Sequence, residues 1–137
     1  MFEVERLDTG VKTVAAMGGA IASYFYGGWS NLLEILLAFV VIDYVTGIMA
    51  SGIEGKLSSL VGIKGIARKV FIFVMVAVAH LVDTSIGDGS LFRDATVFFY
   101  LANELISILE NAGRVGLPVP DILKQALEVL KGRSDTK

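Results

Sequence analysis

The sequence predicts an all-α membrane protein that crosses the bilayer several times, and three observations support this fold class. Hydrophobic residues make up 54% of the 137 residues and charged residues only 19%, which leaves too little polar surface for a small soluble domain. The mean hydropathy is +0.68. Four segments approach the roughly 20 mostly apolar residues that a helix needs to cross a membrane. A soluble bundle of buried helices is the alternative, and the shortage of polar surface argues against it.

The four predicted spans belong to one membrane domain, residues 1–137, and follow one another closely along the chain. The first is rich in glycine and alanine, the second contains Glu34 and Asp43, and the third opens on Arg68 and Lys69. The fourth ends before the Leu-Pro-Val-Pro stretch at 117–120, because proline lacks an amide hydrogen and constrains the residue before it. The predicted spans are residues 11–29, 31–51, 67–86 and 91–110.

A short amphipathic helix is expected after the last span, at residues 121–132. Asp121 is placed to cap its first amide groups. The helical period puts apolar side chains on one face and charged or amide side chains on the other. This helix suits a membrane surface or a partner helix. The apolar face consists of Ile122, Leu123, Ala126, Leu127 and Leu130.

The charges between the spans predict the topology. The segment 52–69 carries Lys56, Lys64, Arg68 and Lys69 against a single acid, Glu54. Because cytoplasmic loops collect lysine and arginine, this segment is expected inside the cell, and four spans then place the N and C termini inside as well. The net charge of −2 and the lack of a basic stripe give no reason to expect a nucleic-acid partner. The absence of cysteine excludes disulfides and thiolate metal sites.

Asp43 is an unusual residue inside an apolar run, because a carboxylate in the bilayer is costly. Three explanations stay open from the sequence. The carboxyl group is protonated, or it lies at the cytoplasmic interface and pairs with Lys64, Arg68 or Lys69, or it faces another helix or water. The small residues that follow it on the same face, such as Gly47 and Ala50, favour close helix packing.

Polar residues also mark the third and fourth spans. His80 and Asp83 share one helical face, and they supply too few ligands for a metal site. In the fourth span the polar residues recur every three or four positions, so they form a stripe that must face a partner helix or water. A self-contained bundle and a wet oligomer both remain open, and we favour the oligomer. The candidate residues for an oligomer or pore face are Asp43, His80, Asp83, Arg93, Thr96, Tyr100, Asn103, Glu104 and Ser107.

Six short motifs follow one another along residues 43–120. They are Asp-Tyr-x-Thr-Gly at 43–47, Lys-Leu-Ser-Ser at 56–59, Gly-x-Lys-Gly-x-x-x-Lys at 62–69, Ala-His-Leu-x-Asp at 79–83, Asn-Glu-x-x-Ser-Ile-Leu-Glu-Asn at 103–111 and Gly-Leu-Pro-x-Pro at 116–120. Together they cover most of residues 31–130, and in this order they resemble the phage holin and toxin-secretion holin family. The resemblance implies a small phage-type protein of the bacterial cytoplasmic membrane that assembles and opens lesions for a muralytic enzyme or a large toxin.

The sequence therefore predicts a holin rather than an enzyme, with no cofactor and no bound metal. Its expected partners are further copies of itself and the lipid bilayer, with a functional link to an endolysin or a secreted toxin. The expected location is the bacterial inner membrane, with several spans. A narrow ion or proton channel using Asp43, His80 and Glu104 is the main alternative, and a passive membrane scaffold without a pore is another.

Overall fold

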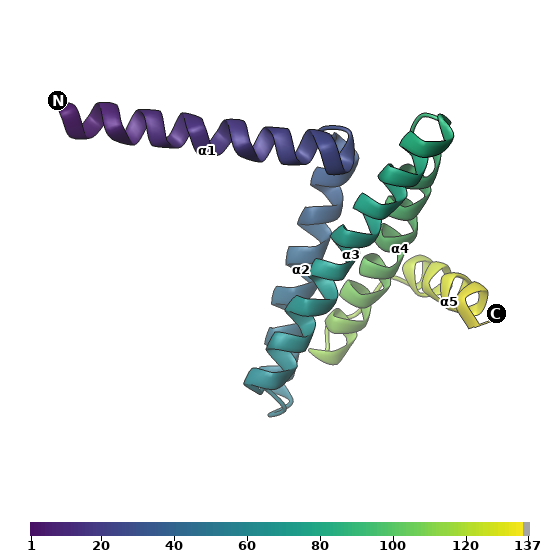
Figure 1. The fold of residues 1–137 in the computed structure, drawn as a ribbon. Helices are drawn as coiled ribbons and strands as arrows, with labels where there is room; N and C mark the ends of the chain where they lie inside the picture. The colour runs from purple at the N-terminus through teal and green to yellow at the C-terminus, as the bar shows by residue number, and fades with distance from the viewer. Residues whose placement is uncertain (136–137) are drawn as a thin grey trace.

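The computed structural model describes residues 1–135, and the described chain is entirely helical, without strands. Figure 1 shows the central helices lying side by side as a bundle, with the first and last helices of the chain extending away from it. The all-α prediction is confirmed. The helices are α1 (Phe2–Tyr26), α2 (Asn31–Ile53), α3 (Ser59–Ile86), α4 (Leu91–Arg114) and α5 (Asp121–Asp135).

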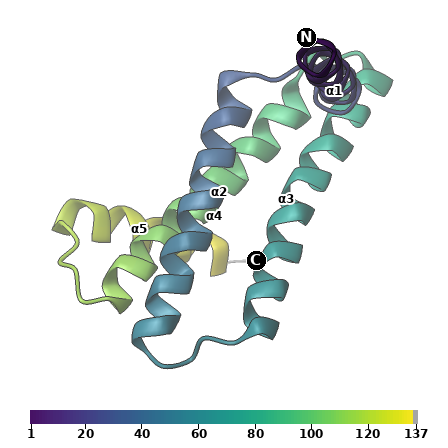
Figure 2. The same ribbon diagram turned by 90° about the vertical axis from the view of Figure 1, so that its left-hand side faces the viewer.

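Helices α2, α3 and α4 form the bundle, and α4 packs against both of the others. Contacts between α2 and α3 are fewer, and Figure 2 shows these two helices separated, with α4 behind them. The apolar core lies in the half of the bundle near the start of α2. It consists of Leu33, Leu36, Val40, Ile72, Val76 and Val97.

Serine caps set the starts of two bundle helices. The Ser30 hydroxyl accepts a hydrogen bond from the Leu33 amide at 3.3 Å, and the Ser58 hydroxyl accepts one from the Val61 amide at 3.2 Å. Such caps satisfy amide groups that have no partner within the helix. As a result α3 begins at Ser59 instead of residue 67. The predicted basic loop 52–69 is reduced to residues 54–58, and Arg68 and Lys69 lie well inside a helix.

Two of the four predicted spans are long and apolar enough to cross a membrane, namely α2 and α3. In α4 the polar stripe lowers the hydropathy, and in α1 glycine and the charged first turns do the same. The finding supports a membrane protein and gives fewer candidate spans than predicted.

The two outer helices have little contact with the bundle. Helix α1 has no buried residue and runs crosswise to the bundle axis in Figure 1. Helix α5 follows the predicted start at Asp121, and residues 121–126 are all exposed. Two members of its predicted apolar face, Leu127 and Leu130, have side chains outside the described part of the structure.

Candidate functional site

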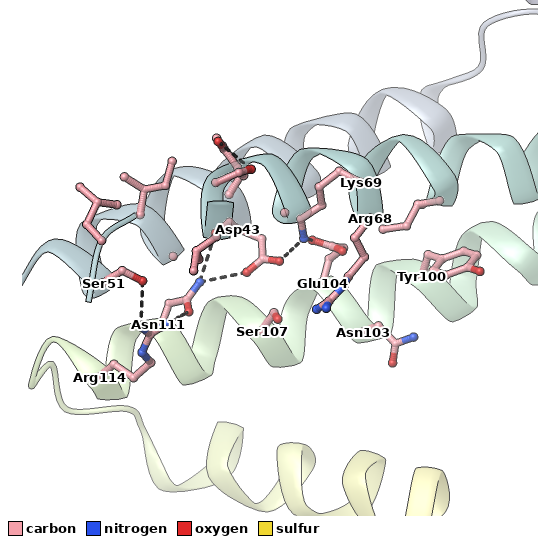
Figure 3. A pocket seen from close by; sticks show the side chains of 18 residues that line it. Asp43, Ser51, Arg68, Lys69, Tyr100, Asn103, Glu104, Ser107, Asn111 and Arg114 are labelled. Carbon is pink, nitrogen blue, oxygen red and sulfur yellow. Dashed lines mark hydrogen bonds and ion pairs between the residues drawn. The ribbon is translucent and has the colours of Figure 1, made fainter. Parts of the chain in front are cut away.

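A buried ionic cluster joins the three bundle helices at the middle of the bundle (Figure 3). The Lys69 ammonium of α3 donates to Asp43 Oδ2 of α2 and, at 2.6 Å, to Glu104 Oε2 of α4. Both acidic residues are buried, with 6% and 4% of their surface exposed. One cation therefore serves two carboxylates taken from different helices. Such a cluster holds the helices in register, because removing one partner leaves a buried charge uncompensated.

Asn111 extends the cluster toward the end of the bundle that carries the α2–α3 loop. Its amide nitrogen donates to Asp43 Oδ1 at 2.9 Å, to the Asp43 carbonyl oxygen at 3.1 Å and to Thr46 Oγ1 at 3.0 Å. The side chain is 7% exposed. Asp43 thus accepts from a lysine with one carboxylate oxygen and from an amide with the other, so neither oxygen is left without a donor.

Arg114 closes the same end of the bundle. Its Nε donates to Glu54 Oε1 at 3.0 Å, and its two terminal nitrogens donate to Asn111 Oδ1 and Ser51 Oγ, each at 3.2 Å. The hydrogen bond from Arg114 holds the pKa of the Glu54 carboxyl group below its usual value. The end of α4 is thereby tied to the end of α2.

A second polar group lies at the opposite end, where α3 turns into α4. The Asp83 carboxylate accepts hydrogen bonds from the amides of Phe92 and Arg93, both at 2.8 Å. It therefore caps the N-terminus of α4 from a neighbouring helix, where a negative charge is favourable. Asp83 is 1% exposed.

His80 and Arg93 pack against Gly27, which ends α1. The Arg93 Nη1 donates to the Tyr26 carbonyl oxygen at 2.8 Å. The φ angle of Gly27 is +73°, and a Cβ there would lie 2.8 Å from His80 Cε1. The His80 Nδ1 is buried and has no hydrogen-bond partner among the described residues.

The rest of the predicted stripe on α4 divides into two groups. The Thr96 hydroxyl bonds to the Phe92 carbonyl oxygen of its own helix at 2.7 Å. Tyr100, Asn103 and Ser107 line a cleft of about 360 Å³ between α2 and α3, which the ionic cluster also borders. Figure 3 shows these side chains along the α4 side of the cleft.

The nine predicted site residues thus do not share one surface. Asp43 and Glu104 meet in the ionic cluster, whereas His80, Asp83 and Arg93 lie together at the α3–α4 turn. Asp43 pairs with Lys69 of the 52–69 segment and also faces another helix through Asn111, so it combines elements of two of the three explanations. The central role of Lys69 between two acids was missed, although an acid in each neighbouring span was the available signal.

The sequence of the chain is similar to those of known proteins. A sequence model described as the bacteriophage holin family matches residues 20–132. An uncharacterized protein of Halalkalibacterium halodurans is 54% identical over 89% of this chain and 94% of its own length. An uncharacterized protein of Listeria monocytogenes is 48% identical, over 85% of this chain and 83% of its own. A protein of Bacillus phage phi105 named as a probable holin is 32% identical, over 85% and 87%. No solved structure matches the chain.

Proposed function

Because the chain belongs to the bacteriophage holin family, we propose that it assembles in the bacterial cytoplasmic membrane and opens non-selective lesions. The cargo is an endolysin or a toxin. The observation that carries this proposal is the match of the family over residues 20–132, supported by the related probable holin of Bacillus phage phi105. The family also supports a non-enzymatic membrane protein.

Membrane insertion is supported by the outer surface of the bundle. Helices α2 and α3 have mean hydropathies of 2.1 and 1.9 over their most apolar stretches, of which only 22% is buried. A soluble monomer rarely exposes so large an apolar surface. In the proposed arrangement α4 crosses beside them, because the bundle covers Glu104 and Asn111 of this helix.

The proposed topology places the α2–α3 loop and the C terminus in the cytoplasm. Lys56 lies in this loop, and Lys64 and Arg68 lie in the adjoining turns of α3. A reporter inserted at Lys56 and a second fused after Lys137 should both show cytoplasmic activity, since basic segments stay inside. Periplasmic activity of either fusion contradicts this topology. The N terminus is cytoplasmic only if residues 11–29 form a further span.

In the proposed assembly, the α4 residues that the ionic cluster leaves free face water. Asn103 is exposed and makes no hydrogen bond within the described part of the chain. With Tyr100 and Ser107 it forms the polar side of the cleft. Helices α2 and α3 make few contacts with each other. If they moved apart, the cleft would open, and its polar side would face the polar side of a neighbouring copy. Polar groups in a membrane face such partners or a wet cavity.

Release of a folded protein tests the proposed function. The chain is expressed in bacteria with a cytoplasmic muralytic enzyme and a folded fluorescent reporter. We expect abrupt lysis and release of the reporter, whereas the enzyme alone should leave the cells intact. Collapse of the membrane potential without passage of the enzyme would instead indicate the narrow channel. The channel is disfavoured because His80 lies at the α3–α4 turn, away from Asp43 and Glu104, which are both engaged by Lys69.

A further inference from the structure

Helix α1 is joined to the bundle by a bend at residues 26–30, which we call the elbow. The Tyr26 hydroxyl donates to the Phe73 carbonyl oxygen at 3.2 Å, and the Tyr26 carbonyl oxygen accepts from Arg93 Nη1 at 2.8 Å. Gly27 has the left-handed conformation and no space for a side chain beside His80. Contacts from α3 and α4 therefore fix the direction in which α1 departs, crosswise to the bundle (Figure 1).

The uncharged part of α1 is too short to cross a membrane. Its charged residues all lie at or before Lys12, and residues 13–26 carry no charge. Fourteen helical residues extend about 21 Å, whereas the hydrocarbon core of a bilayer is about 30 Å thick. An apolar stretch of this length is more typical of a helix at the membrane interface than of a span.

The apolar side chains of α1 form a stripe along one face. Val4, Leu7, Val11, Val14 and Ile21 recur at alternating intervals of three and four residues, apart from one turn occupied by Gly18. Each of these five side chains is exposed, from 55% for Ile21 to 71% for Val14. The Asp8–Lys12 ion pair, at 2.8 Å, lies beside this stripe and not within it. The stripe therefore has no partner within the described chain.

Aromatic residues mark the level at which α1 departs. Tyr24 precedes the elbow and Trp29 lies within it, and they are 66% and 51% exposed. Tyrosine and tryptophan gather where the membrane meets water, because their rings are apolar with a polar tip. The elbow is at the end of the bundle opposite the basic α2–α3 loop. With that loop in the cytoplasm, the elbow lies at the outer interface.

We propose that α1 lies along the outer surface of the membrane, with its apolar stripe seated at the boundary between lipid headgroups and acyl chains. The charged side chains, all in the first turns of the helix, then reach water. This placement rests on the proposed insertion of α2–α4, and it puts the N terminus outside the cell. It differs from the expectation that residues 11–29 cross the membrane.

Single cysteines test the placement, because the chain has none of its own. The variants Glu3→Cys and Lys56→Cys are exposed to a membrane-impermeant maleimide in intact spheroplasts before lysis begins. We expect complete labelling at residue 3 and protection at residue 56 until the membrane is opened. The time of lysis in each variant reports separately on the proposed function.

A nitroxide on Val11→Cys or Lys12→Cys identifies what the stripe contacts. The labelled proteins are reconstituted in vesicles of phosphatidylethanolamine and phosphatidylglycerol. At residue 11 we expect higher accessibility to oxygen, which dissolves in lipid, and at residue 12 higher accessibility to a water-soluble nickel chelate.

Protection of Glu3→Cys until lysis would overturn the proposal in favour of a fourth span. Equal accessibility at residues 11 and 12, or spin–spin broadening between copies at residue 11, would overturn it in favour of a wet or protein-covered stripe. External labelling of Lys56→Cys would contradict both this proposal and the proposed topology.

Discussion

Replacing Lys69 with methionine is expected to destabilise the bundle by about 3–5 kcal/mol, the range typical when one partner of a buried ion pair is removed. The ammonium group of Lys69 is shared by Asp43 and Glu104, whose side chains are 8% and 6% exposed. Methionine fills a similar volume and leaves two buried carboxylates facing each other without a cation. Reversible unfolding of the purified protein in mixed micelles, followed by circular dichroism, measures the change. In cells, lysis should be lost or strongly delayed.

Arg68→Met is the matched control for this prediction. Arg68 is the neighbouring residue of the same helix, is exposed, and makes no ion pair within the described part of the chain. Its replacement should change the free energy of unfolding by no more than about 0.5 kcal/mol. Combining Lys69→Met with Asp43→Asn and Glu104→Gln removes the unpaired charges and should recover part of the lost stability. Equal stability of the two single variants would show that the ionic cluster does not hold the bundle together.

The helices themselves were largely predictable from the sequence. The starts of α2, α4 and α5 were predicted at their observed positions, because apolar runs, the Asp121 cap and the proline pair at 118 and 120 are local signals. The start of α3 was misplaced because the apolar run begins only after Lys69. The helix begins earlier, where Ser58 caps it. Hydropathy indicates which residues suit the membrane interior, whereas the hydrogen bonds of the caps determine where a helix begins and ends.

The pairing of polar groups was less predictable. Helical periodicity placed Glu104 on a polar face of α4, but it does not show which neighbouring helix that face meets. Asp43 had three candidate cations, and the structure selects Lys69, whose ammonium group reaches both Asp43 and Glu104. The elbow could not be predicted from the sequence either, because the contacts that fix it join Tyr26 to residues 47 and 67 positions away.

Replacing Asp43 with leucine is expected to cost about 3 kcal/mol and to abolish or delay lysis, whereas asparagine should cost less and retain function. Leucine removes the acceptors of Lys69 and Asn111, and a hydrogen bond to a charged group contributes about 1.5–3 kcal/mol. Asparagine keeps one carbonyl oxygen for Lys69, although its amide group then faces the donating nitrogen of Asn111. Unfolding in micelles and the time of lysis are measured for both variants.

The exposed position Val41, on the same helix, provides the control, since Val41→Leu should change neither quantity by more than a small amount.

The comparison of the asparagine and leucine variants separates a packing role of Asp43 from a titrating role. If Asp43 holds the helices through its two acceptor oxygens, stability and lysis decline together from aspartate to asparagine to leucine, and the pH dependence of lysis stays the same. If Asp43 instead gates the assembly by taking up a proton, asparagine changes the pH dependence of lysis while stability is nearly unchanged. Wild-type stability and lysis in the leucine variant would contradict both roles, and the contacts of Lys69 and Asn111 with Asp43 would then make no net contribution to the bundle.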